Sequence, residues 1–322
     1  MNAPADAAAA LREAQRIAIG CHVNPDGDTM GSALALSFAL QSLGKESCLL
    51  CQDAVPDNLQ FLPGSERFRS DPGGFQADLG LLVDLEGMGR LGRLADYFAS
   101  LPRLVTVDHH QPQDGVGDIR VIDTSAASTA EIAYRVIVEL GPHSSAEMAT
   151  ALLTGLVTDT GGFRFPNTRP EHLELAAHWA RSGANLASIF EHAYENRSFA
   201  AQQLMGRALA GLQRSPDGRS VWAALAYRDF EETGCTDAET EGIVYHLRAI
   251  RDAEVAVLFR ESRPGRIRVS LRSRGQVDVA AIAHKLGGGG HRNAAGCSFE
   301  GSLDDAVKTT LAEVSAWTDS SS

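Results

Sequence analysis

Short apolar runs alternate with longer helical patterns through the first half of the chain. The runs at residues 46–51, 79–83 and 103–107 are nearly all apolar, and residues 16–23 form a similar run before a helical pattern at 28–43. Strands that are apolar on both faces and alternate with helices are typical of a parallel sheet covered by helices on both sides. Ligands of such sheets bind beyond the carboxyl ends of the strands. The pattern therefore predicts an α/β fold with a site at that edge.

Acidic and histidine residues stand where these runs end, and also after a predicted helix at residues 146–158. The segments are His22-Val-Asn-Pro-Asp26-Gly-Asp28, Leu-Leu-Val-Asp84, Asp108-His109-His110 and Asp159-Thr-Gly-Gly. Because three of them follow strands of one predicted sheet, we expect them to converge. Oxygen and nitrogen ligands without cysteine suit a hard or borderline divalent ion, and they exceed the needs of one ion. With a shared carboxylate, the set fits a two-metal site for phosphate-ester hydrolysis.

Taken singly, most of these segments also have a structural interpretation. The turn at residues 24–28 could lead into a helix capped by Asp28 or Thr29, and His22 could be a structural histidine. Asp84 and Asp159 could be caps. An acidic residue and two imidazoles directly after a buried strand, as at residues 108–110, are harder to explain without a function. The occurrence of all four segments together favours a site.

The net charge argues against one class of partner. The 322 residues include 29 lysine and arginine residues against 41 acidic ones, a formal net charge of −12. A protein that binds long nucleic acid usually presents a basic surface to its phosphates. We therefore expect no long duplex as a partner. A small, multiply charged ligand held by a local basic pocket and metal ions is compatible with the composition.

The five cysteines are predicted to be reduced thiols in the core. Cys48-Leu-Leu-Cys51 has a redox or zinc spacing, but it lies in a predicted strand, and no second pair follows at zinc-site spacing. An odd number of cysteines and an N-terminus unlike a signal peptide indicate a reducing cytoplasm. No apolar stretch approaches the ~18 residues that a membrane span needs, so we expect no membrane association.

The strand and helix pattern restarts after Ser215-Pro-Asp-Gly218 and predicts a smaller mixed α/β domain. Its strands are expected at residues 221–226, 254–259 and 266–271, with a helix at 279–286. Six arginines gather here: Arg260, Arg263, Arg266, Arg268, Arg272 and Arg274. Strand alternation places Arg266, Arg268, Ser270 and Arg272 on one face. This face is either a solvated patch or a binding surface for an anion.

A run of four glycines, Gly287–Gly290, precedes His291 and Arg292. Consecutive glycines allow backbone amides to approach an anion closely, and the two charged side chains would add hydrogen-bond donors. A flexible hinge between a helix and a strand is the alternative.

Together these motifs resemble the DHH phosphoesterase superfamily, which is named after the motif Asp108-His109-His110, and its DHH-associated C-terminal domain. The resemblance extends from residue 16 through residue 296. It implies one metal ion at His22, Asp26 and Asp84, and a second at Asp28, Asp84, His109 and Asp159, so that Asp84 bridges. The two ions are usually Mn²⁺, with Mg²⁺ or Co²⁺ as alternatives. Asp108 and His110 would be the catalytic residues. His110 would contact the substrate phosphate, and Asp108 would support the site without being a metal ligand.

The resemblance also implies substrate contacts and domain boundaries. Nucleotide contacts would come from Ser270, Arg272, Gly288, Gly289, Gly290, His291 and Arg292, and from Arg164 in a loop just after Asp159. Ser128-Thr129 would be either a helix cap or a phosphate contact. The implied layout is a catalytic domain at residues 1–190, a helical linker at 191–215 and a substrate-binding domain at 216–322.

Within the superfamily, this layout resembles the NrnA-like oligoribonucleases and pAp phosphatases. It implies a homodimer that cleaves very short RNA (nanoRNA), such as pApA, and pAp by hydroxide attack at two metal ions. A cyclic dinucleotide phosphodiesterase, acting on c-di-AMP, shares both domains and is the main alternative. An inorganic pyrophosphatase shares the four metal motifs, but the glycine-rich segment favours a nucleotide. From another class, a nucleotide-binding regulator without catalysis is disfavoured because every metal position is filled.

Overall fold

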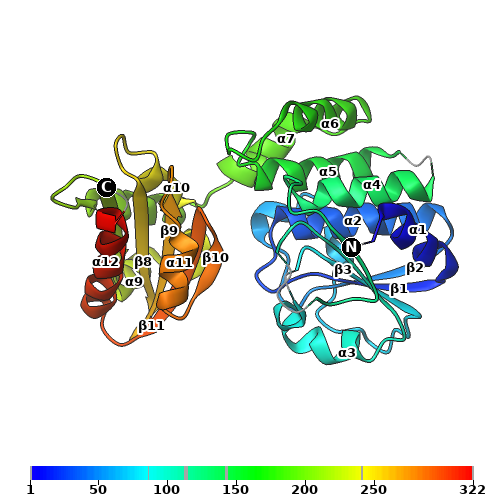
Figure 1. Cartoon of the computed structure of the whole chain (residues 1–322), viewed down its shortest axis with the longest axis horizontal. Coiled ribbons are helices and arrows are strands. Elements are labelled where there is room, and N and C mark those ends of the chain that lie inside the picture. The colour runs from blue at the N-terminus through cyan, green and yellow to red at the C-terminus, as the bar shows by residue number, and fades with distance from the viewer. Residues whose placement is uncertain (1, 86, 112–114, 142–143, 241, 321–322) are drawn as a thin grey trace. The chain divides into compact units, whose positions relative to one another are not determined.

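The computed structural model describes residues 2–85, 87–111, 115–141, 144–240 and 242–320. The chain forms two compact units, Met1–Asn196 and Arg197–Ser322. Figure 1 shows the helices and strands of each unit. Residues 191–215, which we expected to form a helical linker, are divided between the units. Helix α8 (Phe199–Ala210) packs Leu204, Met205 and Ala208 into the core of the second unit.

The first unit contains a five-stranded sheet in which every strand pair is parallel, which confirms the predicted fold class. The strand order is β2 (Glu46–Leu50), β1 (Arg16–Gly20), β3 (Leu79–Val83), β4 (Leu104–Asp108) and β5 (Ile119–Ile122). Strand β3 is buried throughout, as its apolar sequence predicts. Because parallel strands end at the same edge, the residues that follow β1, β3 and β4 are brought together.

Helices cover one face of this sheet in successive layers (Figure 1). They are α1 (Pro4–Glu13), α2 (Gly27–Ser42), α4 (Thr129–Leu140) and α5 (Ala146–Asp159), with α6 (Pro170–Arg181) packed on α5. The other face carries the 3-10 helix η3 (Met88–Leu94) and α3 (Ala95–Ala99). Phe98 of α3 lies so close to the sheet that a Cβ on Gly20 would be 2.6 Å from its ring. Shorter elements are η1 (Asp57–Leu59), η2 (Ser65–Arg67), α7 (Leu186–Phe190) and the π-helical turn η4 (Glu191–Glu195).

The second unit contains a six-stranded mixed sheet, as predicted for a mixed α/β domain. The order is β10 (Gly289–His291), β11 (Ala294–Glu300), β9 (Arg266–Ser273), β8 (Val255–Arg263), β7 (Ser220–Leu225) and β6 (Gln213–Arg214). Strands β7 and β8 are parallel, and the other described pairs are antiparallel. Helices α8, α9 (Tyr227–Thr233) and α10 (Ile243–Arg248) pack on one face, and η5 (Asp237–Thr240) precedes α10. Helices α11 (Val279–Lys285) and α12 (Leu303–Ser320) pack on the other face.

Several short elements were not predicted, among them β5, β10, α9 and α10. Each of these four has only three to seven residues, so its hydrophobic period is too short to recognise, and it depends on pairing or packing with longer neighbours. In the part of the chain that the structure describes, every helix is too short or too polar to cross a membrane.

Candidate functional site

The turn between β1 and α2 carries His22, Asp26 and Asp28. His22 follows β1 and is almost completely buried. Asp26 is the N-cap of α2, because its Oδ1 accepts hydrogen bonds from the backbone N–H groups of Asp28 at 3.0 Å and Thr29 at 3.1 Å. The prediction that Asp28 or Thr29 caps this helix was therefore wrong. Asp28 lies inside the first turn, with its side chain completely buried.

Asp84 follows β3 and lies among three imidazoles, those of His22, His109 and His110. Its φ of +59° is a left-handed conformation that residues other than glycine rarely adopt. Its Oδ2 lies 3.4 Å from Nε2 of His22, and its Oδ1 lies 3.7 Å from Nε2 of His109. One carboxylate thus reaches histidines that follow two different strands.

The motif at residues 108–110 ends β4, and each of its two imidazoles contacts one further carboxylate besides Asp84. Asp108 is completely buried, and its Oδ1 accepts hydrogen bonds from the backbone N–H and from Nδ1 of His110, at 3.0 and 2.8 Å. Nε2 of His109 lies 3.2 Å from Oδ2 of Asp159, the last residue of α5. Asp108 therefore fixes the ring of His110, whereas His109 connects β4 to α5.

Asp28 reaches the same place because α2 and α5 approach each other closely. The contact depends on Gly155, where a Cβ would lie 2.7 Å from Oδ1 of Asp28. A larger side chain at this position would push against the carboxylate. The glycine thus allows ligands from two helices to meet.

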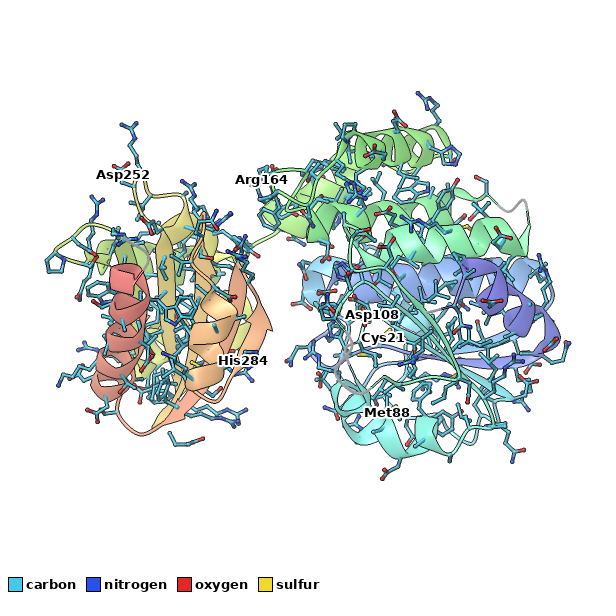
Figure 2. All side chains as sticks on the ribbon, viewed as in Figure 1. Cys21, Met88, Asp108, Arg164, Asp252 and His284 are labelled. Atoms are coloured by element: carbon cyan, nitrogen blue, oxygen red, sulfur yellow. The ribbon has the colours of Figure 1, made fainter. Side chains whose placement is uncertain are left out.

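Eight residues converge at the carboxyl edge of the first sheet, and we name them the Asp84 cluster. They are His22, Asp26, Asp28, Asp84, Asp108, His109, His110 and Asp159. Their ligand atoms form three groups in which all atoms lie within 4.8 Å of one another: His22, Asp26 and Asp84; Asp28, His109 and Asp159; Asp84, His109 and His110. Figure 2 labels Asp108 and Cys21 at this end of the sheet. The structure thus brings together every residue that we predicted as a metal ligand or catalytic residue.

The charges of the Asp84 cluster are unbalanced in the absence of a cation. Burial alone would lower the pKa of His22, but hydrogen bonds and charges from Asp26 and Asp84 raise it to about 10. Burial would raise the pKa of Asp84, but the neighbouring imidazoles hold it well below its usual range. Burial and the carboxylates of Asp84 and Asp159 raise the pKa of Asp28 well above its usual range. A divalent cation would relieve this repulsion between carboxylates.

The donor set fits divalent metal ions. It consists of carboxylate oxygens and imidazole nitrogens, which suit Mn²⁺ and Mg²⁺. Nδ1 of His22 lies 2.9 Å from the carbonyl oxygen of Val23, and Nδ1 of His109 lies 3.4 Å from that of Ala126. Such contacts orient metal-binding imidazoles, with Nε2 directed at the ion. Oδ2 of Asp108 is buried and, within the described residues, has no hydrogen-bond partner, which also suits a nearby positive charge.

The N-terminus of α4 supports the cluster in a way that the sequence did not reveal. Thr129 donates its hydroxyl to Oδ1 of Asp84 at 2.8 Å and its backbone N–H to Oδ2 of Asp28 at 2.6 Å. The N–H of Ala130 donates to Oδ1 of Asp28 at 2.9 Å. Ser128 caps the helix, so that the cap interpretation of Ser128-Thr129 holds for Ser128 only. A helix N-terminus stabilises a carboxylate, and here it positions two of them.

Arg164 lies in the loop after α5 and is exposed. Its Nε donates to the carbonyl oxygen of Gly161 at 2.5 Å, and its guanidinium lies 5.7 Å from the ring centre of Tyr194. Figure 2 labels it apart from Asp108.

The cysteines behave as predicted for core thiols. All five are buried and unbonded to one another, and burial raises the pKa of Cys51 and of Cys297 to about 11.

In the second unit, the arginine face consists of Arg266, Arg268, Ser270 and Arg272. These residues alternate with buried Ile267, Val269 and Leu271, as the period of β9 predicts. Asp237 lies 2.8 Å from Nη1 of Arg268 and 3.5 Å from Nη1 of Arg260 on the neighbouring strand. Arg260 also donates to Oγ of Ser270 at 2.9 Å. The guanidinium of Arg272 lies 5.1 Å from the ring centre of Tyr245.

The glycine run forms β10 and part of the turn before it. A Cβ on Gly288 would lie 2.1 Å from the carbonyl oxygen of Gly296, and one on Gly290 would lie 2.6 Å from that of Ala294. These glycines are therefore required by the close pairing with β11, which the hinge interpretation did not include. Arg292 is exposed and donates to Gln276. The side chain of His291 lies outside the described part of the structure.

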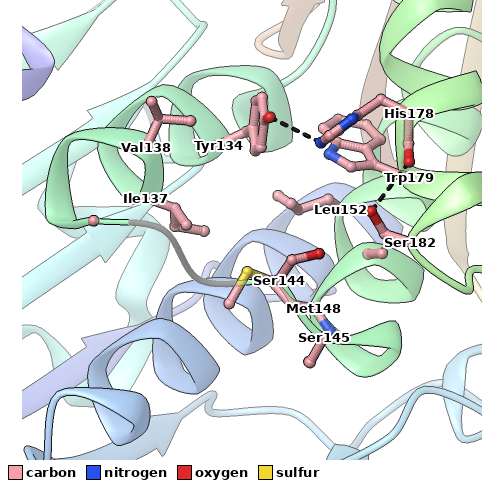
Figure 3. A pocket seen from close by; sticks show the side chains of 12 residues that line it. Tyr134, Ile137, Val138, Ser144, Ser145, Met148, Leu152, His178, Trp179 and Ser182 are labelled. Atoms are coloured by element: carbon pink, nitrogen blue, oxygen red, sulfur yellow. Dashed lines mark hydrogen bonds between the residues drawn. The ribbon is translucent and has the colours of Figure 1, made fainter.

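A cavity of about 470 Å³ lies elsewhere in the first unit, among α4, α5 and α6 (Figure 3). Tyr134, Met148 and Trp179 contribute to its mostly apolar lining, and no member of the Asp84 cluster lines it. This lining does not suit a phosphate ester.

Comparisons with known proteins agree with the motifs. The model of the N-terminal domain of the DHH family matches residues 16–156, and the DHHA1 domain matches residues 219–319. The chain is 36% identical over 304 residues to the bifunctional oligoribonuclease and PAP phosphatase NrnA of Thermus thermophilus, covering 92% of this chain and 89% of that protein. The Bacillus subtilis protein of the same name is 28% identical, with 86% and 87% covered. An exopolyphosphatase-related protein from Bacteroides fragilis has a similar structure, with a TM-score of 0.91, 29% identity and coverage of 98% and 96%.

Proposed function

This chain belongs to the DHH phosphoesterase family, and from that premise we propose that it is a metal-dependent hydrolase of very short oligoribonucleotides and of pAp. The position of Asp84 carries the proposal, because its two oxygens lie 3.4 Å and 3.7 Å from histidines that follow different strands. This arrangement supports two ions that share Asp84. The names of the relatives in Thermus thermophilus and Bacillus subtilis, which match most of the chain, support the substrate class.

We assign one ion to His22, Asp26 and Asp84, and the other to Asp28, Asp84, His109 and Asp159, with Mn²⁺ as the metal. When bound, such a pair of ions lowers the pKa of water and neutralises charge on the phosphate. The backbone N–H groups of Thr129 and Ala130 hold both oxygens of Asp28 in place. These hydrogen bonds support the assignment of Asp28 as a metal ligand.

Asp108 and His110 act on the substrate side in this proposal. The carboxylate of Asp108 accepts a hydrogen bond from Nδ1 of His110 at 2.8 Å, which fixes the orientation of the ring. We assign His110 to a phosphate oxygen of the substrate, where an imidazolium would donate a charge-assisted hydrogen bond. Asp108 is then a positioning residue for His110.

The second unit supplies nucleotide contacts in this proposal, through Ser270, Arg272, Gly288, Gly289, Gly290, His291 and Arg292. Because Arg260 donates to Oγ of Ser270, the hydrogen of that hydroxyl can be donated to a phosphate or ribose oxygen. Arg164 of the first unit is a further proposed contact. We also propose that the protein is cytoplasmic and that it forms a homodimer. Light scattering on the purified protein would test the homodimer.

A hydrolysis time course with Mn²⁺ tests the proposal by comparing pAp, pApA, c-di-AMP and pyrophosphate. We expect cleavage of pAp and pApA, and loss of activity when a chelator removes the metal. A clear preference for c-di-AMP would instead support a cyclic dinucleotide phosphodiesterase, and a preference for pyrophosphate would support a pyrophosphatase. Nucleotide binding without cleavage of any of the four would support a regulator.

A further inference from the structure

A buried carboxylate that takes no part in the proposed chemistry lies beside the Asp84 cluster. Glu131, in the first turn of α4, has only 6% of its side chain exposed. Its Oε1 pairs with Arg135 and lies 3.9 Å from Nη2 of Arg169, and its Oε2 lies 3.2 Å from Nε2 of the fully buried His172. Burying a carboxylate is costly unless it is paired in this way. Its contacts with three side chains fix the position of the Glu131 carboxylate.

The tautomer of His172 follows from its contacts. The backbone N–H of Arg169 donates to Nδ1 of His172 at 2.9 Å, so Nδ1 carries no hydrogen. Nε2 must then carry the proton and donate it to Oε2 of Glu131. His172, from α6, therefore holds the carboxylate of Glu131 in place by a hydrogen bond.

In front, Glu131 holds the peptide groups of Ala127. Its Oε2 accepts the N–H of Ala127 at 3.0 Å. The carbonyl oxygen of Ala127 accepts a hydrogen bond from Nδ2 of Asn167 at 3.2 Å, and the same Nδ2 donates to the carbonyl oxygen of Asp159, also at 3.2 Å. Side chains from two other parts of the first unit thus fix both backbone polar groups of one residue.

Ala127 lies between backbone groups that contact candidate metal ligands. The carbonyl oxygen of Ala126 lies 3.4 Å from Nδ1 of His109. Two residues after Ala127, Thr129 contacts Asp84 and Asp28. A shift of the Ala127 peptide would therefore move the partners of ligands assigned to both ions. Groups that orient metal ligands in this way typically change metal affinity by roughly 10–100-fold when they are lost.

We propose that Glu131 and Asn167 are positioning residues that hold Ala127 in place and thereby set the affinity of the site for metal. Neither residue contacts the reacting atoms. This inference rests on the proposed metal site, and the alternative is that Glu131 merely stabilises the packing of α4 against α6.

Titration of the metal-free protein with Mn²⁺, followed by calorimetry, tests the proposal without any turnover. Glu131→Leu keeps the volume of the side chain but leaves the N–H of Ala127 without its acceptor. We expect about tenfold weaker Mn²⁺ binding, at the lower end of the range for orienting groups. Glu131→Gln, whose amide oxygen can still accept that N–H, should restore most of the affinity. Asn167→Ala, a change at an exposed position, should weaken binding several-fold and serves if Glu131→Leu does not fold.

Two controls separate positioning from stability. Glu139→Leu changes an exposed glutamate of the same helix and should leave Mn²⁺ binding unchanged. Met148→Ala removes a buried side chain in the same helical layer, so it should lower the Tm and leave Mn²⁺ affinity as in the parent protein. Parent-like affinity in both Glu131→Leu and Asn167→Ala would overturn the inference. A parent protein that binds no divalent ion would instead refute the proposed metal site itself.

Discussion

The Asp84 cluster and the arginine face are both rich in charge, but their charges are balanced differently. Five carboxylates meet three imidazoles in the cluster, and within it burial and neighbouring carboxylates raise the pKa of Asp28. On the arginine face, Arg268 pairs with Asp237, and Arg266 lies 3.8 Å from Glu300. A cation would therefore relieve repulsion in the cluster, whereas carboxylates of the protein neutralise much of the arginine face. The charge of a side chain alone does not identify a binding residue. The number of partners that the side chain already has within the protein is equally informative.

Arg272 differs from its neighbours on the arginine face. It contacts the ring of Tyr245, and its Nη1 donates to the carbonyl oxygen of Leu271 at 3.0 Å, but among the described residues it forms no ion pair and its buried Nε has no hydrogen-bond partner. A buried donor of this kind is costly unless a ligand or water satisfies it. We therefore expect an anionic ligand to depend on Arg272 more than on Arg266 or Arg268.

Removing the carboxylate of Asp84, which lies near histidines that follow two different strands, should have the largest effect on activity and metal binding. Asp84→Asn is expected to lower kcat by roughly 10³-fold or more, a loss comparable to that of a strong electrostatic stabiliser of a transition state. It should also abolish tight binding of both ions, which Mn²⁺ titration measures. Asp96→Asn, at an exposed position on α3, is the matched control and should behave as the parent. An Asp84→Asn protein that binds two ions tightly would refute the bridging role.

The cluster should also respond to pH in a defined direction. Because the pKa of His22 is raised from 6.5 to about 10, its stabilisation of the metal-free fold is complete below pH 6.5 and is lost as the pH rises towards 10. Metal binding requires the neutral imidazole, so Mn²⁺ affinity should rise over the same interval.

Thermal melts with and without Mn²⁺, at pH 6.5 and at two higher values below pH 10, would show this as opposite trends. The metal-free Tm should fall while the increase in Tm caused by Mn²⁺ grows. His22→Gln, which cannot gain a proton, should remove the part of the trend that His22 causes. Parallel trends with and without metal in the parent would contradict the assignment.

A substitution of Arg272 tests the arginine face in the same comparison. Arg272→Ala should raise KM for pApA by one to two decades, because a charge-assisted hydrogen bond contributes ~1.5–3 kcal/mol. Mn²⁺ affinity should not change, since Arg272 belongs to the second unit and the cluster to the first. Arg266→Ala removes the same charge from the same strand face at a residue already near Glu300, and its effect on KM should be smaller. Equal effects of the two substitutions would show that net charge, not partner number, decides binding.

Much of the first unit could be predicted because its signals are local. Apolar runs predicted β1 to β4, and the residues directly after β1, β3 and β4 had to share an edge once the sheet was parallel. Edge strand β5, with four residues, has too short a pattern to be recognised. The capping role of Asp26 was missed because Asp26 and Asp28 are both good N-caps, and only the backbone at the turn decides between them.

Long-range support of the site could not be predicted. Thr129 contacts Asp84 across 45 residues of sequence, and His172 reaches Glu131 across 41. Neither contact has a spacing rule, because it depends on how α4 packs against the sheet and against α6. Similarly, the sequence placed Arg266 and Arg272 on one face of β9. It did not reveal that Asp237 neutralises Arg268, because Asp237 belongs to η5, a different segment of the chain.

The smallest expected effect concerns substrate length, and it separates the local arginine face from the acidic protein as a whole. Short RNA should be hydrolysed with a higher kcat/KM than long RNA, because the net charge of −12 repels phosphates that no basic residue contacts. Salt screens that repulsion, with a Debye length of ~10 Å at 0.1 M. Raising the ionic strength should therefore narrow the difference between dinucleotides and longer RNA without reversing it. The measurement is kcat/KM for RNA of increasing length at low and moderate salt, with Arg266→Ala as a variant in which the difference should widen slightly. An efficiency that rises with length, or cleavage of long duplex DNA, would show that an extended basic track exists, and the contrast between a small arginine face and an acidic exterior would then be wrong.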